Sequence, residues 1–223
     1  MPLVRNIVAL FVMLFMSMTL SAQEYTEGVD SLRRSVPDSL RRTYRHSDAV
    51  QLLTIKRDTL AAIEIWEDIL REDRDYAPAN YYLSMTHLPI NDSSAEYARR
   101  AYVADSTNKW YVQNYGTQLI TIGNYNEALP VYRRLLALDK YNISAYYGLA
   151  YLYNYSRMPY SAITVLDSAD MRLGRNQHIS AFKQRLLLET KQYDKAIAEG
   201  RRIITEYPYD IEARLSLAET YSV

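Results

Sequence analysis

The sequence predicts an all-α fold, a solenoid of antiparallel helix pairs, because several residues recur along it with a period of 34. Ala128, Ala162 and Ala196 are spaced by this period, and a tyrosine precedes each of them by two or three residues. Two further series keep the same frame: Gly116, Ala150, Gln184 and Ala218, and Leu119, Tyr153, Leu187 and Tyr221. One period shared by three series is typical of a chain built from stacked supersecondary units.

The residue types within one period indicate two helices that cross closely. Antiparallel helices approach each other where both carry small side chains, so we expect Gly116 to lie near Ala128. Larger residues such as Leu119 and Tyr132 should fill the space on either side of the crossing.

The turn between the two helices is marked by Gly123 and Asn124. Asn124 with Glu127 three residues later predicts a capping box at the start of the second helix. The next period has Arg157 at the position of the turn glycine.

This pattern resembles the tetratricopeptide repeat, a helix–turn–helix unit of 34 residues with small residues in both helices. The resemblance covers residues 43 to 223. It divides this range into degenerate repeats at 43–76 and 77–108, regular repeats at 109–142, 143–176 and 177–210, and the first helix of an incomplete repeat at 211–223. It implies a right-handed superhelix whose concave face is lined by the first helix of each repeat.

The N-terminus predicts an exported protein. Arg5 precedes an apolar run from Ile7 to Leu20, and small residues follow, so residues 1–22 are expected to be a cleaved signal peptide. The polar segment 23–42 is expected to be an N-terminal helical cap or a linker. No second apolar run of this kind follows, so we expect no membrane span after cleavage and a location in the periplasm or cell envelope of a Gram-negative bacterium.

Composition and motifs argue against an enzyme. The 26 basic and 26 acidic residues cancel, which does not favour nucleic-acid binding. The chain has no cysteine, and His46, His87 and His178 lie in different repeats without metal-ligand spacing. Neither a glycine-rich phosphate loop nor a nucleophile-elbow motif is present. We therefore predict no catalytic residue, no metal site and no cofactor.

The resemblance implies a partner-binding groove made by exposed first-helix positions. The main candidates are Tyr81, Trp110, Gln113, Tyr147, Tyr151, Asn154 and Tyr155, and further positions are Met85, Thr117, His178, Arg185 and Glu189. Tyr147, Tyr151 and Tyr155 step by four residues and so form one stripe on their helix. The competing interpretation is that these aromatic rings pack between adjacent repeats.

These features predict a non-catalytic scaffold that binds a protein or peptide. Two alternatives stay open: a glycan-binding subunit of an envelope uptake system, and the N-terminal sensor or adaptor part of a longer repeat protein. The helix at 211–223 would leave an apolar face unburied, which indicates either a longer parent protein or docking on another molecule, including self-association.

Overall fold

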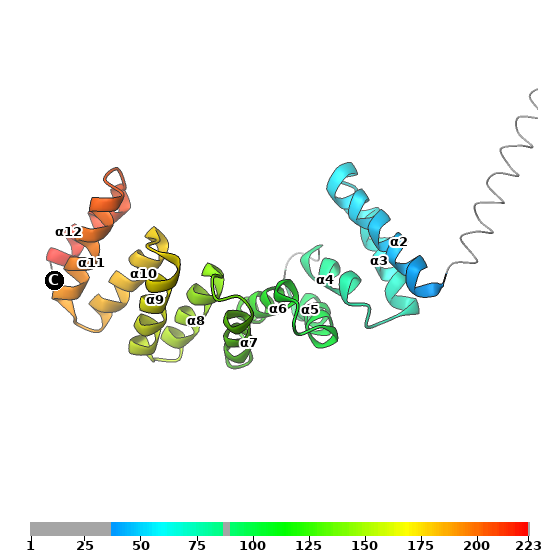
Figure 1. The fold of residues 1–223 in the computed structure, drawn as a ribbon, viewed down its shortest axis with the longest axis horizontal. Coiled ribbons are helices and arrows are strands. Elements are labelled where there is room, and N and C mark those ends of the chain that lie inside the picture. The colour runs from blue at the N-terminus through cyan, green and yellow to red at the C-terminus, as the bar shows by residue number, and fades with distance from the viewer. Residues whose placement is uncertain (1–36, 87–89, 223) are drawn as a thin grey trace, which may run out of the picture. The chain divides into compact units, whose positions relative to one another are not determined.

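The computed structural model describes residues 37–86 and 90–222, and within these ranges every regular element is helical (Figure 1). The predicted all-α class of antiparallel helix pairs is therefore confirmed. The predicted signal peptide at 1–22, most of the 23–42 segment and His87 lie outside the described residues. None of the helices in the described ranges is both long and apolar enough to cross a membrane.

The chain divides into two compact units, Met1–Glu72 and Asp73–Val223. The described part of the first unit holds helix α2 (Asp38–Gln51), the π-helical turn η1 (Leu52–Lys56) and helix α3 (Thr59–Glu72). Helix α2 begins directly after Pro37, inside the predicted 23–42 segment, so that segment's last residues belong to the first helix pair.

The core of the first unit forms around a fully buried tryptophan. Trp66 donates a hydrogen bond from its indole N–H to Nδ1 of His46 at 3.0 Å. Burial lowers the pKa of His46, which favours the neutral imidazole that this bond requires. His46 is therefore a structural histidine that joins α2 to α3.

The second unit contains nine helices within the described residues. They are α4 (Ala77–Thr86), α5 (Asp92–Ala104), α6 (Lys109–Thr121), α7 (Tyr125–Leu138), α8 (Ile143–Tyr155), α9 (Pro159–Leu173), α10 (Gln177–Glu189), α11 (Tyr193–Glu206) and α12 (Ile211–Tyr221). Helices that follow each other in sequence pack side by side. The first helices α6, α8, α10 and α12 begin at 34-residue steps, as do the second helices α7, α9 and α11.

The first helices begin at these steps because each has a capping side chain at the same position of the period. Asn108, Asn142, Asn176 and Asp210 each accept a hydrogen bond from a backbone N–H in the first turn of the helix that follows. Such caps satisfy donors that an α-helix cannot pair internally. The same frame therefore sets the start of four helices.

The turns inside the helix pairs share a left-handed residue. Gly123, Arg157 and Lys191, spaced by 34, all have positive φ, between 59° and 83°. The expected capping box of Asn124 and Glu127 is wrong: the Asn124 side chain makes no capping hydrogen bond, and the Glu127 carboxylate instead accepts one from the Tyr115 hydroxyl. The left-handed turn, closed by a hydrogen bond from the Asn124 backbone N–H to the Leu119 carbonyl at 2.8 Å, directs the chain into the second helix.

The core of the second unit follows the predicted small-residue series. Ala128, Ala162 and Ala196 are fully buried. A Cβ atom built at Gly116 would lie 2.8 Å from Cε2 of the Tyr132 ring, so this glycine faces that ring. Tyr132 fills the crossing, because a glycine leaves room for an aromatic ring where an alanine would not.

A buried charged cluster joins α9, α10 and α11. Lys183 is almost fully buried, and its ammonium lies 2.7 Å from Asp167, 2.8 Å from Asp170 and 3.4 Å from Glu199. Arg202 pairs with Asp170 at 3.2 Å and with Glu199. Buried charges are tolerated only when they are paired, so these contacts hold three successive helices in one arrangement.

Candidate binding groove on the first helices

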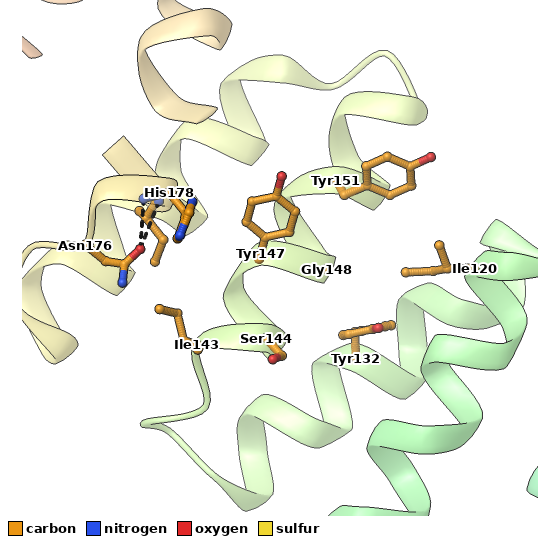
Figure 2. Close-up of a pocket in the computed structure, with 10 residues that line it drawn as sticks. Ile120, Tyr132, Ile143, Ser144, Tyr147, Gly148, Tyr151, Asn176 and His178 are labelled. Atoms are coloured by element: carbon orange, nitrogen blue, oxygen red, sulfur yellow. Dashed lines mark hydrogen bonds between the residues drawn. The ribbon is translucent and has the colours of Figure 1, made fainter. Parts of the chain in front are cut away.

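A cavity of about 580 Å³ opens on the first helices of the second unit. It is lined by residues of α6, α7, α8 and the start of α10: Ile120, Tyr132, Ile143, Ser144, Tyr147, Gly148, Tyr151, Asn176, His178 and Ile179 (Figure 2). We call this cavity the tyrosine groove. Its volume lies in the range of sites that hold small ligands or a few side chains of a partner.

Two partly exposed tyrosines of α8 stand in this groove. Tyr147 is 42% exposed and Tyr151 is 38% exposed, and they lie one turn apart on the same helix face. The Tyr147 ring packs on Phe182 of α10, with ring centres 5.1 Å apart and planes inclined by 45°. Figure 2 shows Tyr147 between Tyr151 and the start of α10. The Tyr147 ring is thus held in place by Phe182, and both tyrosines remain partly exposed.

The floor of the groove is a buried aromatic ring set against glycine. Gly148 has no side chain, so the Tyr132 ring reaches the groove beneath α8. Burial raises the pKa of Tyr132, and its hydroxyl lies 3.5 Å from the Thr117 hydroxyl. The phenol is therefore neutral, and the floor offers an apolar surface with one polar tip.

The α10 side of the groove is held by a helix cap. The Asn176 amide oxygen accepts hydrogen bonds from the backbone N–H of His178 at 3.0 Å and of Ile179 at 3.3 Å. This cap fixes where α10 starts, and so it fixes the position of the exposed His178 side chain at the edge of the groove.

The structure brings together two of the seven main predicted residues, Tyr147 and Tyr151, and one of the further positions, His178. The other five, Tyr81, Trp110, Gln113, Asn154 and Tyr155, do not line the tyrosine groove.

Three of these five residues make contacts between helices. The Tyr81 ring contacts Tyr111 of α6 with ring centres 5.2 Å apart, and the Gln113 amide oxygen accepts a hydrogen bond from the Asn142 side chain at 3.0 Å. The Tyr155 ring packs on Tyr125, with ring centres 3.9 Å apart. These side chains join neighbouring helices and are not part of the groove lining.

Trp110 and Asn154 have looser surroundings. Trp110 is exposed and carries the Lys109 ammonium 5.4 Å from its ring centre. Asn154 is half-buried, and its carbonyl accepts the backbone N–H of Arg157 in the turn.

The sequence reasoning missed several groove residues. Ile143 and Ser144 lie one turn before Tyr147 and so share its helix face. This spacing could have identified them. Ile120 and Gly148 carry no such signal, because their place in the groove depends on how α6 and α8 cross.

The chemistry of the lining is that of noncovalent binding. The lining residues include no Asp, Glu, Lys or Arg, and they offer three tyrosine hydroxyls, one serine hydroxyl, an amide and an imidazole among apolar groups. No group of three or more potential metal-binding side chains occurs among the described residues. The groove can exclude water from apolar side chains of a ligand while its hydroxyls form hydrogen bonds.

Comparison with known proteins yields structural likeness without sequence likeness. No protein-family model matches the chain, and no curated protein matches it. A crystal structure of a MamA protein superposes with a TM-score of 0.68 at 18% identity, covering 76% of this chain and 96% of that chain.

Two further solved structures are tetratricopeptide repeat proteins. One, from Parabacteroides merdae, gives a TM-score of 0.69 at 16% identity and covers 81% of this chain and 72% of that chain. The other, from Thermus thermophilus, gives a TM-score of 0.54 at 17% identity and covers 82% of this chain and all of that chain. At these identities the likeness concerns the fold and not the partner. The chain has the fold of the tetratricopeptide repeat proteins, the one that its 34-residue period predicted.

Proposed function

We propose that this chain is a non-catalytic scaffold that binds an extended segment of a protein or peptide in the tyrosine groove. The observation that carries the proposal is the groove itself: a cavity of about 580 Å³ on the first helices, with two partly exposed tyrosines in it and no ionised carboxylate, ammonium or guanidinium in its lining. The tetratricopeptide repeat fold supports it, because stacked repeats present extended binding surfaces.

The groove suits a peptide because its aromatic anchors are already ordered. A tyrosine has two side-chain torsions, so fixing it on binding costs little conformational entropy. Tyr147 is held further by Phe182, at 5.1 Å, and Tyr132 is locked between helices. Pre-ordered anchors of this kind usually provide most of the affinity of a peptide interface.

A catalytic role has little support in this groove. General acid–base catalysis needs a titratable group within hydrogen-bond reach of its substrate, usually tuned by a neighbouring charge. His178 is the one imidazole in the lining, and no carboxylate or cationic side chain of the lining accompanies it. Binding is the function that these residues support best.

Replacing both groove tyrosines should abolish peptide binding and leave the fold intact. In Tyr147→Ala with Tyr151→Ala, two anchors of about 2 kcal/mol each are lost, so we expect affinity to fall at least about 100-fold. Helicity should not change, and because both rings are partly exposed the loss of stability should stay near about 1–2 kcal/mol. The measurement is fluorescence anisotropy with peptides selected on the wild-type protein from a random 12-residue display library.

The matched control is Tyr141→Ala with Tyr160→Ala, two exposed tyrosines outside the groove. It should bind the selected peptides as the wild type does. If the groove variant bound the peptides as tightly as the wild type, or if the control variant lost as much affinity as the groove variant, the tyrosine groove would not be the binding site. A collapse of the melting temperature in the groove variant alone would assign the rings to the core.

We also propose that the protein is exported to the periplasm or cell envelope of a Gram-negative bacterium, on the strength of its N-terminal sequence. Expressed in a Gram-negative host, it should appear in the periplasmic fraction with a mature N-terminus near Gln23, as determined by N-terminal sequencing. A variant with Leu10→Arg and Leu14→Arg, which breaks the apolar run, should stay in the cytoplasm at full length. Recovery of the wild-type protein in the cytoplasm with residues 1–22 attached would contradict export.

A further inference from the structure

We infer that the segment bound in the tyrosine groove is a basic one: a bulky apolar side chain enters the groove, and a neighbouring lysine or arginine of the same segment lies toward α12. This inference rests on the proposed function and specifies the chemistry of the partner. It follows from the surfaces on the two sides of α10, which differ in charge.

A second cavity borders the tyrosine groove at His178. This second cavity, of about 210 Å³, lies among α10, α11 and α12, and His178 lines both. A segment that follows the groove past His178 therefore reaches α12 next. The two cavities are therefore neighbours, one beside α8 and the start of α10 and the other beside α10 and α12.

The second cavity is acidic. Asp210 and Glu212 line the second cavity, and Glu219 lies two turns beyond Glu212 on the same face of α12. The tyrosine groove has no charged side chain of this kind in its lining. A ligand therefore meets an apolar half and then an anionic half.

Two of these carboxylates are available to a ligand. The side chains of Glu212 and Glu219 are exposed and form no hydrogen bond or ion pair with other described residues. Asp210 differs, because its carboxylate already accepts hydrogen bonds from the Ala213 backbone N–H and from Gln177. Glu212 and Glu219 thus carry the uncompensated charge.

Two arginines, on α12 and α10, form no ion pair with these carboxylates. The Arg214 guanidinium of α12 donates a hydrogen bond to the backbone carbonyl of Pro208. The Arg185 guanidinium of α10 lies 4.9 Å from the ring centre of Phe182, the ring on which Tyr147 packs. It forms no ion pair with a carboxylate of the described residues. Glu212 and Glu219 are therefore free to pair with a cationic side chain of the partner, and this pairing favours a basic segment among those that fit the apolar half equally well.

The test uses peptides selected from the random display library on the full-length protein, synthesised and measured by fluorescence anisotropy at about 20 mM and 300 mM salt. We expect the selected sequences to combine a bulky apolar residue with a lysine or arginine. Glu212→Gln with Glu219→Gln should weaken their binding about 3- to 10-fold at low salt and much less at high salt, because exposed pairs are weak and screened.

The control is Asp194→Asn with Glu64→Gln, which removes two exposed carboxylates from second helices and should leave binding unchanged. The inference would be overturned if the selected peptides contained no basic residue. It would also be overturned if they bound the Glu212→Gln, Glu219→Gln variant as tightly as the wild type, and in either case the proposed function would still stand. A selection that yields no peptide sensitive to Tyr147→Ala with Tyr151→Ala would overturn both.

Discussion

Replacing Lys183 with methionine is expected to destabilise the second unit by about 3–5 kcal/mol, because it removes one of the two cations that pair with the largely buried carboxylates of Asp170 and Glu199. The Lys183 ammonium lies within 3.4 Å of Asp170 and Glu199, which are largely buried, and of Asp167, which is exposed. Without it, a single guanidinium, that of Arg202, is left to pair with both of the largely buried carboxylates. Methionine keeps a similar length and an apolar stem, so the loss reports on the charge and not on a cavity. Urea unfolding followed by circular dichroism at 222 nm measures the change.

Lys183 should continue to stabilise the folded state up to alkaline pH, because its ammonium stays charged there. Burial alone would lower the pKa of Lys183, but hydrogen bonds to Asp167 and Asp170 and the charge of Glu199 raise it above its ordinary value of 10.5. Because the pKa of Lys183 is higher in the folded state than in the unfolded state, its contribution to the free energy of unfolding is fully present below the unfolded-state pKa. That contribution is lost as the pH rises through the folded-state pKa. The stability difference between wild type and Lys183→Met should therefore stay constant from about pH 7 to about 10 and shrink above that.

Lys195→Met is the control for this substitution. Lys195 is an exposed residue of α11 whose ammonium donates a hydrogen bond to the Gln192 side chain, so its loss should change stability by less than about 0.5 kcal/mol. If Lys183→Met were equally mild, the cluster would be a solvated surface network and would not set the helix arrangement.

The periodic part of this fold was predictable from the sequence because it depends on local interactions. The 34-residue frame places Asn142 and Asn176 before their helices and Gly123 in its turn, and each acts on backbone atoms within three residues. Capping and left-handed turns work without reference to distant parts of the chain. The stripe of Tyr147 and Tyr151 was predictable for the same reason, since helical spacing alone puts them on one face.

The features that depend on packing between helices were not predictable in this way. Gln184 occupies the position of Gly116 and Ala150 in the frame, yet it is fully buried and donates a hydrogen bond to Thr220 at 3.0 Å. Its partner is 36 residues away in sequence, and Lys183 meets partners on both neighbouring second helices. A local sequence pattern does not determine how two such helices cross, so buried polar clusters cannot be predicted from it.

Gly148 is also a residue whose role depends on packing between helices, since the positions one period away are Asn114 and Phe182. Its substitution by alanine should destabilise the second unit by about 1–3 kcal/mol, although alanine is the better helix former by about 1 kcal/mol. A Cβ atom at Gly148 would lie 2.7 Å from Cδ1 and 2.8 Å from Cζ of Tyr132. The ring cannot retreat, because Gly116 lies against its other edge.

A double-mutant cycle with Tyr132→Leu separates this overlap from other causes. If the ring is responsible, Gly148→Ala should become neutral or stabilising in the Tyr132→Leu background, because only the helix preference of alanine then remains. Gly123→Ala provides a contrast: a Cβ atom there meets nothing within 4 Å, so its cost of about 1–2 kcal/mol comes from the positive φ of 83° and should not depend on Tyr132. Urea unfolding of the four cycle members measures the coupling.

Because Tyr132 is also the floor of the tyrosine groove, Gly148→Ala should weaken peptide binding in the folded protein, and unchanged affinity would show that the floor takes no part in recognition.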